Sequence, residues 1–122
     1  MDVKEIRERL QAERTFDHTV GAIKFRVRIP AESRVTRAYT SFSGPAAWFD
    51  AMNMVALEAV VGMTGASTAD LRLPGDPAPL LDSPESIALL LEERQDIATE
   101  LGNEINARLM ARREAIEADR KN

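Results

Sequence analysis

The sequence contains no cysteine and a single histidine, His18, and these shortages exclude most catalytic and metal chemistry. Disulfides, thiolate nucleophiles and zinc thiolates all need cysteine. Neither a glycine-rich phosphate loop nor an HExxH zinc motif occurs along the chain. The longest apolar run, 51–63, is interrupted by Asn53 and Glu58 and falls short of the ~20 residues of a membrane-spanning helix. We therefore expect no disulfide and no membrane span, and we expect the cell interior as the compartment.

The rest of the composition is that of an ordinary globular protein. The chain has 122 residues, of which 44% are hydrophobic and 30% charged, and its net charge is −4. This length suits one domain and is too short for two separate cores. The opening residues carry mixed charges and lack the apolar stretch of a secretory signal. We predict a single domain over 1–122 with no secretory signal.

Apolar residues recur at helical spacing near the start of the chain. Val3, Ile6 and Leu10 are three and four residues apart, and charged side chains fill the positions between them. Asp2 stands where its side chain can cap the first turn. The pattern predicts a short amphipathic helix in segment 1–14.

The period of the pattern then changes from that of a helix to that of a strand. Phe25, Val27 and Ile29 alternate with basic residues, which is typical of a half-buried strand. Gly21 separates this run from a shorter apolar run that precedes it. We predict a β-hairpin over 16–29 with its turn near Gly21.

The remaining apolar residues predict helices through most of segment 30–110. Pro30 is tolerated in a first helical turn and opens an expected helix over 31–42. Segment 46–61 contains no helix breaker, is apolar around nearly its whole circumference and ends at Gly62. A helix of this kind is either central in the fold or covered by a partner.

A proline-rich loop over 71–79 separates this apolar helix from the next one. Ser83, Pro84 and Glu85 together indicate a helix start. The hydroxyl can accept a free amide hydrogen, the proline has none to satisfy, and the carboxylate complements the helix dipole. A polar run at 92–96 predicts a break between two helices.

These patterns together predict a mainly α fold of the α+β class. We expect a single helical domain with a small N-terminal β-hairpin and a helical core over 30–110. The last segment, 111–122, is charged, and Ile116 is its only large apolar residue. We expect this tail to be a solvated, fraying helix end.

Side chains capable of acid–base chemistry form no recognisable constellation. His18 is next to Asp17, but neighbours on a strand face opposite ways and cannot form an orienting pair. The carboxylates of 92–104 recur at helical spacing beside Arg94 and Arg108, which is typical of a solvated helix face. We predict no catalytic residue, no metal ligand and no cofactor, and thus a protein that is not an enzyme.

Basic residues cluster between positions 24 and 37, where Glu32 alone opposes them. This basic patch consists of Lys24, Arg26, Arg28, Arg34 and Arg37. A basic strand could contact the phosphates of a nucleic acid, but alternation places Phe25 on the opposite face, away from any base it could stack on. The net charge of −4 also argues against this partner. Head-to-tail self-association, or docking on an acidic protein, explains the patch at least as well.

Three blocks in the second half of the chain combine apolar, glycine and capping positions. They are AVVGMTGASTADL at 59–71, PLLDSPE at 79–85 and LLLEERQDI at 89–97. These blocks resemble the tail assembly chaperones of long-tailed bacteriophages and related prophages. In that family a helix ends in an apolar-Gly-Trp-x-Gly turn, a loop leads to a proline-rich stretch, and a Ser/Pro-capped helix breaks at an Arg-Pro-Asp-like segment. The similarity covers 23–109, and the strand FRVRIP at 25–30 also fits it.

The resemblance implies a non-catalytic protein that binds the long helical tape measure protein and keeps it soluble until the tail tube polymerises around it. Such chaperones act in the cytoplasm of the bacterial host and are absent from the mature virion. A longer frameshifted form often recruits the tail tube protein. We expect these two partners and no membrane, while self-association stays open. The alternative is a small regulatory or nucleic-acid-binding phage protein that acts through the basic patch.

Apolar residues of the helix over 46–61 and of the neighbouring loops are the candidate partner-binding residues. They are Trp48, Phe49, Met52, Met63, Leu80 and Leu81. Met63 stands where the family often has Trp, and Leu81 stands where an aromatic residue is common. Adaptable methionines beside an apolar helix can offer a groove to amphipathic helices of varied sequence. The alternative, which we favour for most of these residues, is that they fill the core.

Overall fold

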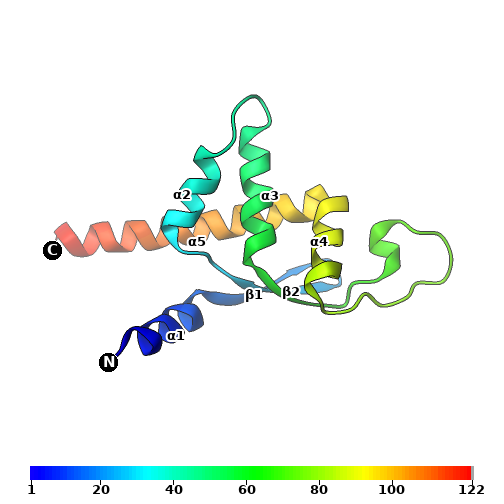
Figure 1. Cartoon of the computed structure of the whole chain (residues 1–122), viewed down its shortest axis with the longest axis horizontal. Coiled ribbons are helices and arrows are strands. Elements are labelled where there is room, and N and C mark those ends of the chain that lie inside the picture. Colours follow the sequence, from blue (N-terminus) through cyan, green and yellow to red (C-terminus); the bar gives the residue numbers. More distant parts are fainter. Residues whose placement is uncertain (122) are drawn as a thin grey trace.

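The computed structural model describes residues 1–121, and within them 62% helix and a small antiparallel sheet confirm the mainly α, α+β prediction (Figure 1). The helices are α1 (Val3–Arg14), α2 (Glu32–Thr40), α3 (Ala47–Ala59), α4 (Pro84–Glu93) and α5 (Gln95–Lys121). The strands are β1 (Thr15–Val20), β2 (Ile23–Arg28) and β3 (Val60–Thr64), and η1 (Thr68–Leu71) is a short 3₁₀ turn. No helix formed by residues 1–121 is both long and apolar enough to cross a membrane.

The N-terminal helix and the hairpin form where the sequence predicts them. The Asp2 carboxylate accepts a hydrogen bond from the Glu5 backbone N–H at 2.8 Å, which caps α1. Strand β1 follows α1 directly and pairs antiparallel with β2, with Phe16 opposite Val27. Gly21 has a φ of 60°, the left-handed region that a tight turn requires and glycine adopts without strain.

A third strand corrects the sequence-based prediction. The helix expected over 46–61 ends at Ala59, and Val60–Thr64 forms β3 on the free edge of β2. A glycine opposite Arg26 eases pairing with β2, because a Cβ at Gly62 would lie only 3.3 Å from the Arg26 Cβ. Gly65 ends the strand with a φ of 86°, and a Cβ there would lie 2.3 Å from the Ala22 carbonyl oxygen. Gly62 therefore permits close strand pairing and Gly65 ends the strand, whereas the helix has already ended at Ala59 and not at Gly62 as expected.

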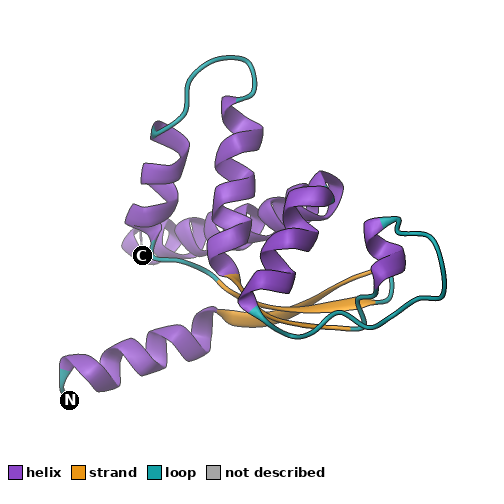
Figure 2. Cartoon of the chain, turned by 45° about the vertical axis from the view of Figure 1, so that its right-hand side comes forward, coloured by secondary structure: helices purple, strands orange, loops and turns teal. Residues whose placement is uncertain are grey.

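The helices α2 to α5 lie on one side of this sheet (Figure 2). Strand β2 alternates strictly, so that Ile23, Phe25 and Val27 are buried beneath the helices and the basic residues between them are exposed. Phe25 has no exposed surface. The sheet thus provides one wall of the core and an open, polar outer face.

The centre of the core is the crossing of α3 and α5. Met52 of α3 and Leu101 of α5 are almost completely buried. Gly102 lies at the closest approach, since a Cβ there would lie 3.1 Å from both the Cβ and the Cε of Met52. The helix of 46–61, predicted to be either central or covered by a partner, is therefore central in the fold.

The predicted break at 92–96 is present and separates α4 from α5. The Ser83 hydroxyl accepts a hydrogen bond from the Ser86 backbone N–H at 3.2 Å and so caps α4 as expected. At the break, the Arg94 guanidinium contacts both oxygens of the Asp96 carboxylate at 2.9 Å. This hydrogen bonding lowers the pKa of Asp96 to about 2 and raises that of Arg94.

The two ends of the described chain project from the body on the same side (Figure 1). Helix α1 contains no buried residue. In α5 the last buried residue is Ile105, and every residue from Met110 to Lys121 is exposed. The expected solvated tail is thus the helical end of α5, and Asn122 lies outside the described residues.

Candidate binding surfaces

The two aromatic residues predicted to bind a partner lie at the start of α3. Trp48 and Phe49 are 50% and 45% exposed, and their rings meet edge to face with centroids 5.8 Å apart. In this geometry the positive edge of one ring meets the negative face of the other, which stabilises both at the surface. These two side chains are accessible to a partner.

Trp48 lines a groove of about 580 Å³ between α2, α3 and the middle of α5. Its apolar walls come from Val35, Tyr39, Ala107, Leu109 and Met110, and we call it the tryptophan groove. The volume lies within the range of ~300–1,000 Å³ that is usual for ligand pockets. The groove can therefore accept several apolar side chains of another chain.

Polar contacts hold the walls of the tryptophan groove in place. The Asn106 side-chain amide donates a hydrogen bond to the Tyr39 hydroxyl at 2.6 Å and links α5 to α2. Arg113 and Glu32 form an ion pair between the same two helices. Met110 is 59% exposed at the edge, where its flexible thioether can adapt to different partners.

Two of the predicted partner-binding residues are core residues instead, which corrects that part of the prediction. Met52 is fully buried against Gly102, and Met63 is 3% exposed on β3. The side chain of Met52 points to α5 because it lies on the inner face of α3, and Met63 faces the helices because it lies across from Phe25. Neither side chain can contact a partner in this structure.

The last two predicted residues lie away from the tryptophan groove. Leu80 donates its backbone N–H to the Ala66 carbonyl at 2.9 Å and packs its side chain against the core. Leu81 is 75% exposed just before α4. Trp48 begins α3, whereas Ala66 follows the strand at the other end of that ~20 Å helix, so the six residues do not form one surface.

The basic patch is partly neutralised. Lys24 and Arg26 extend from the open face of β2 to Asp17 on β1, at 3.3 Å and 3.6 Å. Arg34 on α2 forms an ion pair with Glu58 on α3. Each of these carboxylates offsets positive charge that a nucleic acid phosphate would otherwise meet.

The structure brings two residues of the basic patch together with basic residues that the sequence did not single out. Arg28 and Arg34 line a cleft that also contains Arg7 and Arg14 of α1, whereas Arg37 does not line it. The available signal was the seven-residue separation of Arg7 and Arg14, which places both on one face of a helix. It could not show which part of the fold that face would meet.

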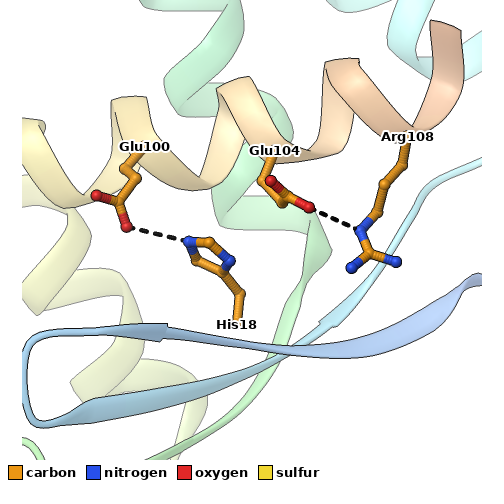
Figure 3. Close-up of polar contacts among 4 residues, drawn as sticks. All are labelled: His18, Glu100, Glu104 and Arg108. Carbon is orange, nitrogen blue, oxygen red and sulfur yellow. Dashed lines mark hydrogen bonds and ion pairs between the residues drawn. The ribbon is translucent and has the colours of Figure 1, made fainter. Parts of the chain in front are cut away.

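The only histidine contacts a carboxylate, and the contact joins the sheet to a helix (Figure 3). The His18 Nε2 lies 3.0 Å from the Glu100 carboxylate of α5, and one turn further on Glu104 accepts a hydrogen bond from Arg108 at 3.0 Å. The Arg108 guanidinium in turn lies 3.7 Å from the centre of the Phe16 ring. These contacts fasten β1 to α5 at the surface.

Residues 1–121 contain no group of three or more histidine, aspartate or glutamate side chains placed to hold a metal ion. No protein-family model, curated protein or solved structure matches this chain.

Proposed function

We propose that this protein is a tail assembly chaperone of a long-tailed bacteriophage or prophage. In this role it binds amphipathic helices of the tape measure protein without catalysis and keeps that protein soluble until the tail tube polymerises around it. The proposal joins the sequence resemblance over 23–109 with a surface suited to helix binding. A longer frameshifted form would recruit the tail tube protein.

The observation that supports this proposal is the tryptophan groove. Three helices enclose it, its walls are mostly apolar, and a half-exposed tryptophan and an exposed methionine lie at its edge. A helix that docks in such a groove inserts apolar side chains from successive turns. The same groove can take many helical segments in turn, because Trp48 and Met110 provide contact area and adaptability rather than a fixed polar pattern.

Trp48 is the only tryptophan of the chain and reports directly on this groove. Co-expression with a tape measure protein should raise the yield of that protein in the soluble fraction and give a complex that co-elutes on size exclusion. In the complex, the fluorescence of Trp48 should shift to shorter wavelength, because the ring leaves water.

Substitutions localise the contact. The pair Trp48→Ala and Met110→Ala should abolish co-elution, since large buried anchors carry most of the energy of an interface. The matched control is the pair Leu73→Ala and Leu81→Ala, which removes two residues that are 55% and 75% exposed outside the groove. If the tape measure protein never co-elutes with the wild-type chain, the proposal is wrong. If the control pair abolishes co-elution and the groove pair does not, the tape measure protein binds elsewhere and the groove is excluded.

A further inference from the structure

A second cleft lies between α1 and the body of the protein. It has a volume of about 630 Å³ and shares no lining residue with the tryptophan groove. Arg7, Gln11 and Arg14 of α1 form one wall, and Arg28 and Arg34 contribute two more guanidinium groups from β2 and α2. We call this site the arginine cleft.

Positive charge in the arginine cleft is poorly compensated. Four guanidinium groups line it against the single carboxylate of Glu58, which pairs with Arg34. Within residues 1–121, no carboxylate lies within 4.0 Å of Arg7, Arg14 or Arg28 to form an ion pair. Such a site favours an anionic ligand, since guanidinium groups bind carboxylates through paired, directional hydrogen bonds.

The helical periodicity of α1 places its arginines and its glutamates on different faces. Arg7 and Arg14 are two turns apart on one face, whereas Glu5 and Glu8 fall on another and are not part of the lining. The apolar stripe of α1, with Val3 64% exposed, lies beside the arginine face rather than in the core. Helix α1 therefore offers apolar and basic side chains together.

Part of the lining of the arginine cleft is apolar. Ile29, Pro30, Ala31 and Val61 provide this part, which we call the floor, and Val61 is 44% exposed. A ligand that fits has apolar side chains next to its negative charges.

We propose that the arginine cleft binds an acidic amphipathic helix of another protein. The helix lies along α1 with apolar residues on the floor and carboxylates facing Arg7 and Arg14, which are ~10 Å apart along α1, the same separation as glutamates at i and i+7 of a helix. A free phosphate would leave the apolar floor uncovered. The phosphate backbone of a nucleic acid would likewise leave the apolar floor uncovered.

A designed peptide tests this inference independently of any tape measure protein. The probe is a fluorescein-labelled helical peptide of about 18 residues with glutamates at i and i+7 and leucines between them. Fluorescence anisotropy with the full chain should show binding that weakens as salt is raised from about 50 to 500 mM. The same peptide with glutamine in place of glutamate should bind much more weakly.

Matched variants identify the cleft. The pair Arg7→Ala and Arg14→Ala should weaken peptide binding about tenfold. The pair Lys4→Ala and Arg9→Ala removes the same charge from residues of α1 that do not line the cleft, and it should change affinity less than about twofold. Arg28→Gln removes the positive charge that β2 contributes to the cleft, so it should weaken peptide binding without altering α1. Circular dichroism should then show the helix content of the wild type.

The following results would overturn the inference. Equal losses for the two α1 pairs would show a response to net charge alone. Equal binding of the glutamine peptide, or displacement of the probe by duplex DNA or by millimolar inorganic phosphate, would assign another ligand class. The protein could also self-associate in a way that the probe does not reverse and that the pair Arg7→Ala and Arg14→Ala abolishes. In that case the occupant of the cleft would be a second copy of this chain.

Discussion

Helices α1 and α3 have nearly the same length but opposite relations to the core. Helix α1 has 12 residues and none is buried, whereas α3 has 13 residues and buries Ala51, Met52, Val55, Ala56 and Ala59. Isolated helices of this length are marginal in water, so most helical stability in a protein comes from packing. Helix α3 receives that packing from the fold. Helix α1 has its cap and its direct continuation into β1, and its apolar stripe stays available for another chain.

The largest expected loss of stability comes from truncating a side chain in the packed core. Phe25→Ala removes a fully buried ring beneath the helices and should destabilise the protein by about 3–5 kcal/mol. Urea unfolding followed by circular dichroism measures this. Since that variant can fall below the threshold for folding, Phe25→Leu provides a graded second measurement and should lose about 1.5 kcal/mol or less. A loss below about 1 kcal/mol for Phe25→Ala would contradict the assigned core.

Overpacking the crossing of α3 and α5 should have the next largest effect. Gly102→Leu places a side chain where even a Cβ would lie 3.1 Å from Met52, so we expect a loss of about 1–3 kcal/mol. The control is Ala111→Leu in the exposed part of the same helix, which should stay within about 0.5 kcal/mol of wild type. Equal stabilities of the two variants would show that the helices do not cross at Gly102.

A smaller loss of stability is expected when the N-terminal cap of α4 is removed, because packing of this helix remains. Ser83→Ala leaves the Ser86 backbone N–H without its side-chain acceptor and should cost about 1 kcal/mol. Ser33→Ala in α2, where no side chain caps the helix, is the matched control and should have little effect. If thermal unfolding shows the same midpoint for both variants, the cap contributes nothing to α4.

The Arg94–Asp96 contact predicts a weak pH dependence. Arg94 lowers the pKa of Asp96 to about 2, below its ordinary 3.8. The stabilisation is thus fully present above about pH 4 and is lost as the pH falls toward 2. It should amount to less than about 1 kcal/mol, because the Asp96 side chain is 66% exposed and solvent screens the pair. Urea unfolding at several pH values should show this loss in wild type and in Asp119→Asn but not in Asp96→Asn.

The smallest effect is expected on the unpacked side of the comparison. Ile6→Ala in α1 should change the free energy of unfolding by less than about 0.5 kcal/mol, because Ile6 is 43% exposed and contributes nothing to the core. The same substitution should still weaken binding of the acidic peptide described above. A loss above about 1 kcal/mol without a partner would mean that α1 packs on the body in solution.

Much of the fold follows from local patterns. Caps at Asp2 and Ser83, strand alternation around Phe25 and the polar break at 92–96 are properties of neighbouring residues, and all of them are present in the structure. Strand β3 was missed because Val60 and Val61 continue the apolar pattern of α3, and only pairing with β2 converts them to strand. Local sequence contains no signal for a strand that completes the edge of a distant hairpin.

The candidate sites were predictable in part. Trp48 and Phe49 are half-exposed, whereas Met52 and Met63 are buried. Met52 lies on the inner face of α3 and Met63 lies in β3 opposite Phe25, and composition alone indicates neither position. The arginine cleft combines residues from α1, β2, α2 and α3, which come together only through the fold.

By itself the amino-acid sequence determined the main helices and the hairpin of this protein and the absence of cysteine chemistry, because capping, periodicity and composition act over a few residues. Strand β3 depended on the fold. The tertiary structure alone decided which apolar residues remain exposed and which arginines share a cleft. Burial and the summation of charge depend on distances between segments that are far apart along the chain.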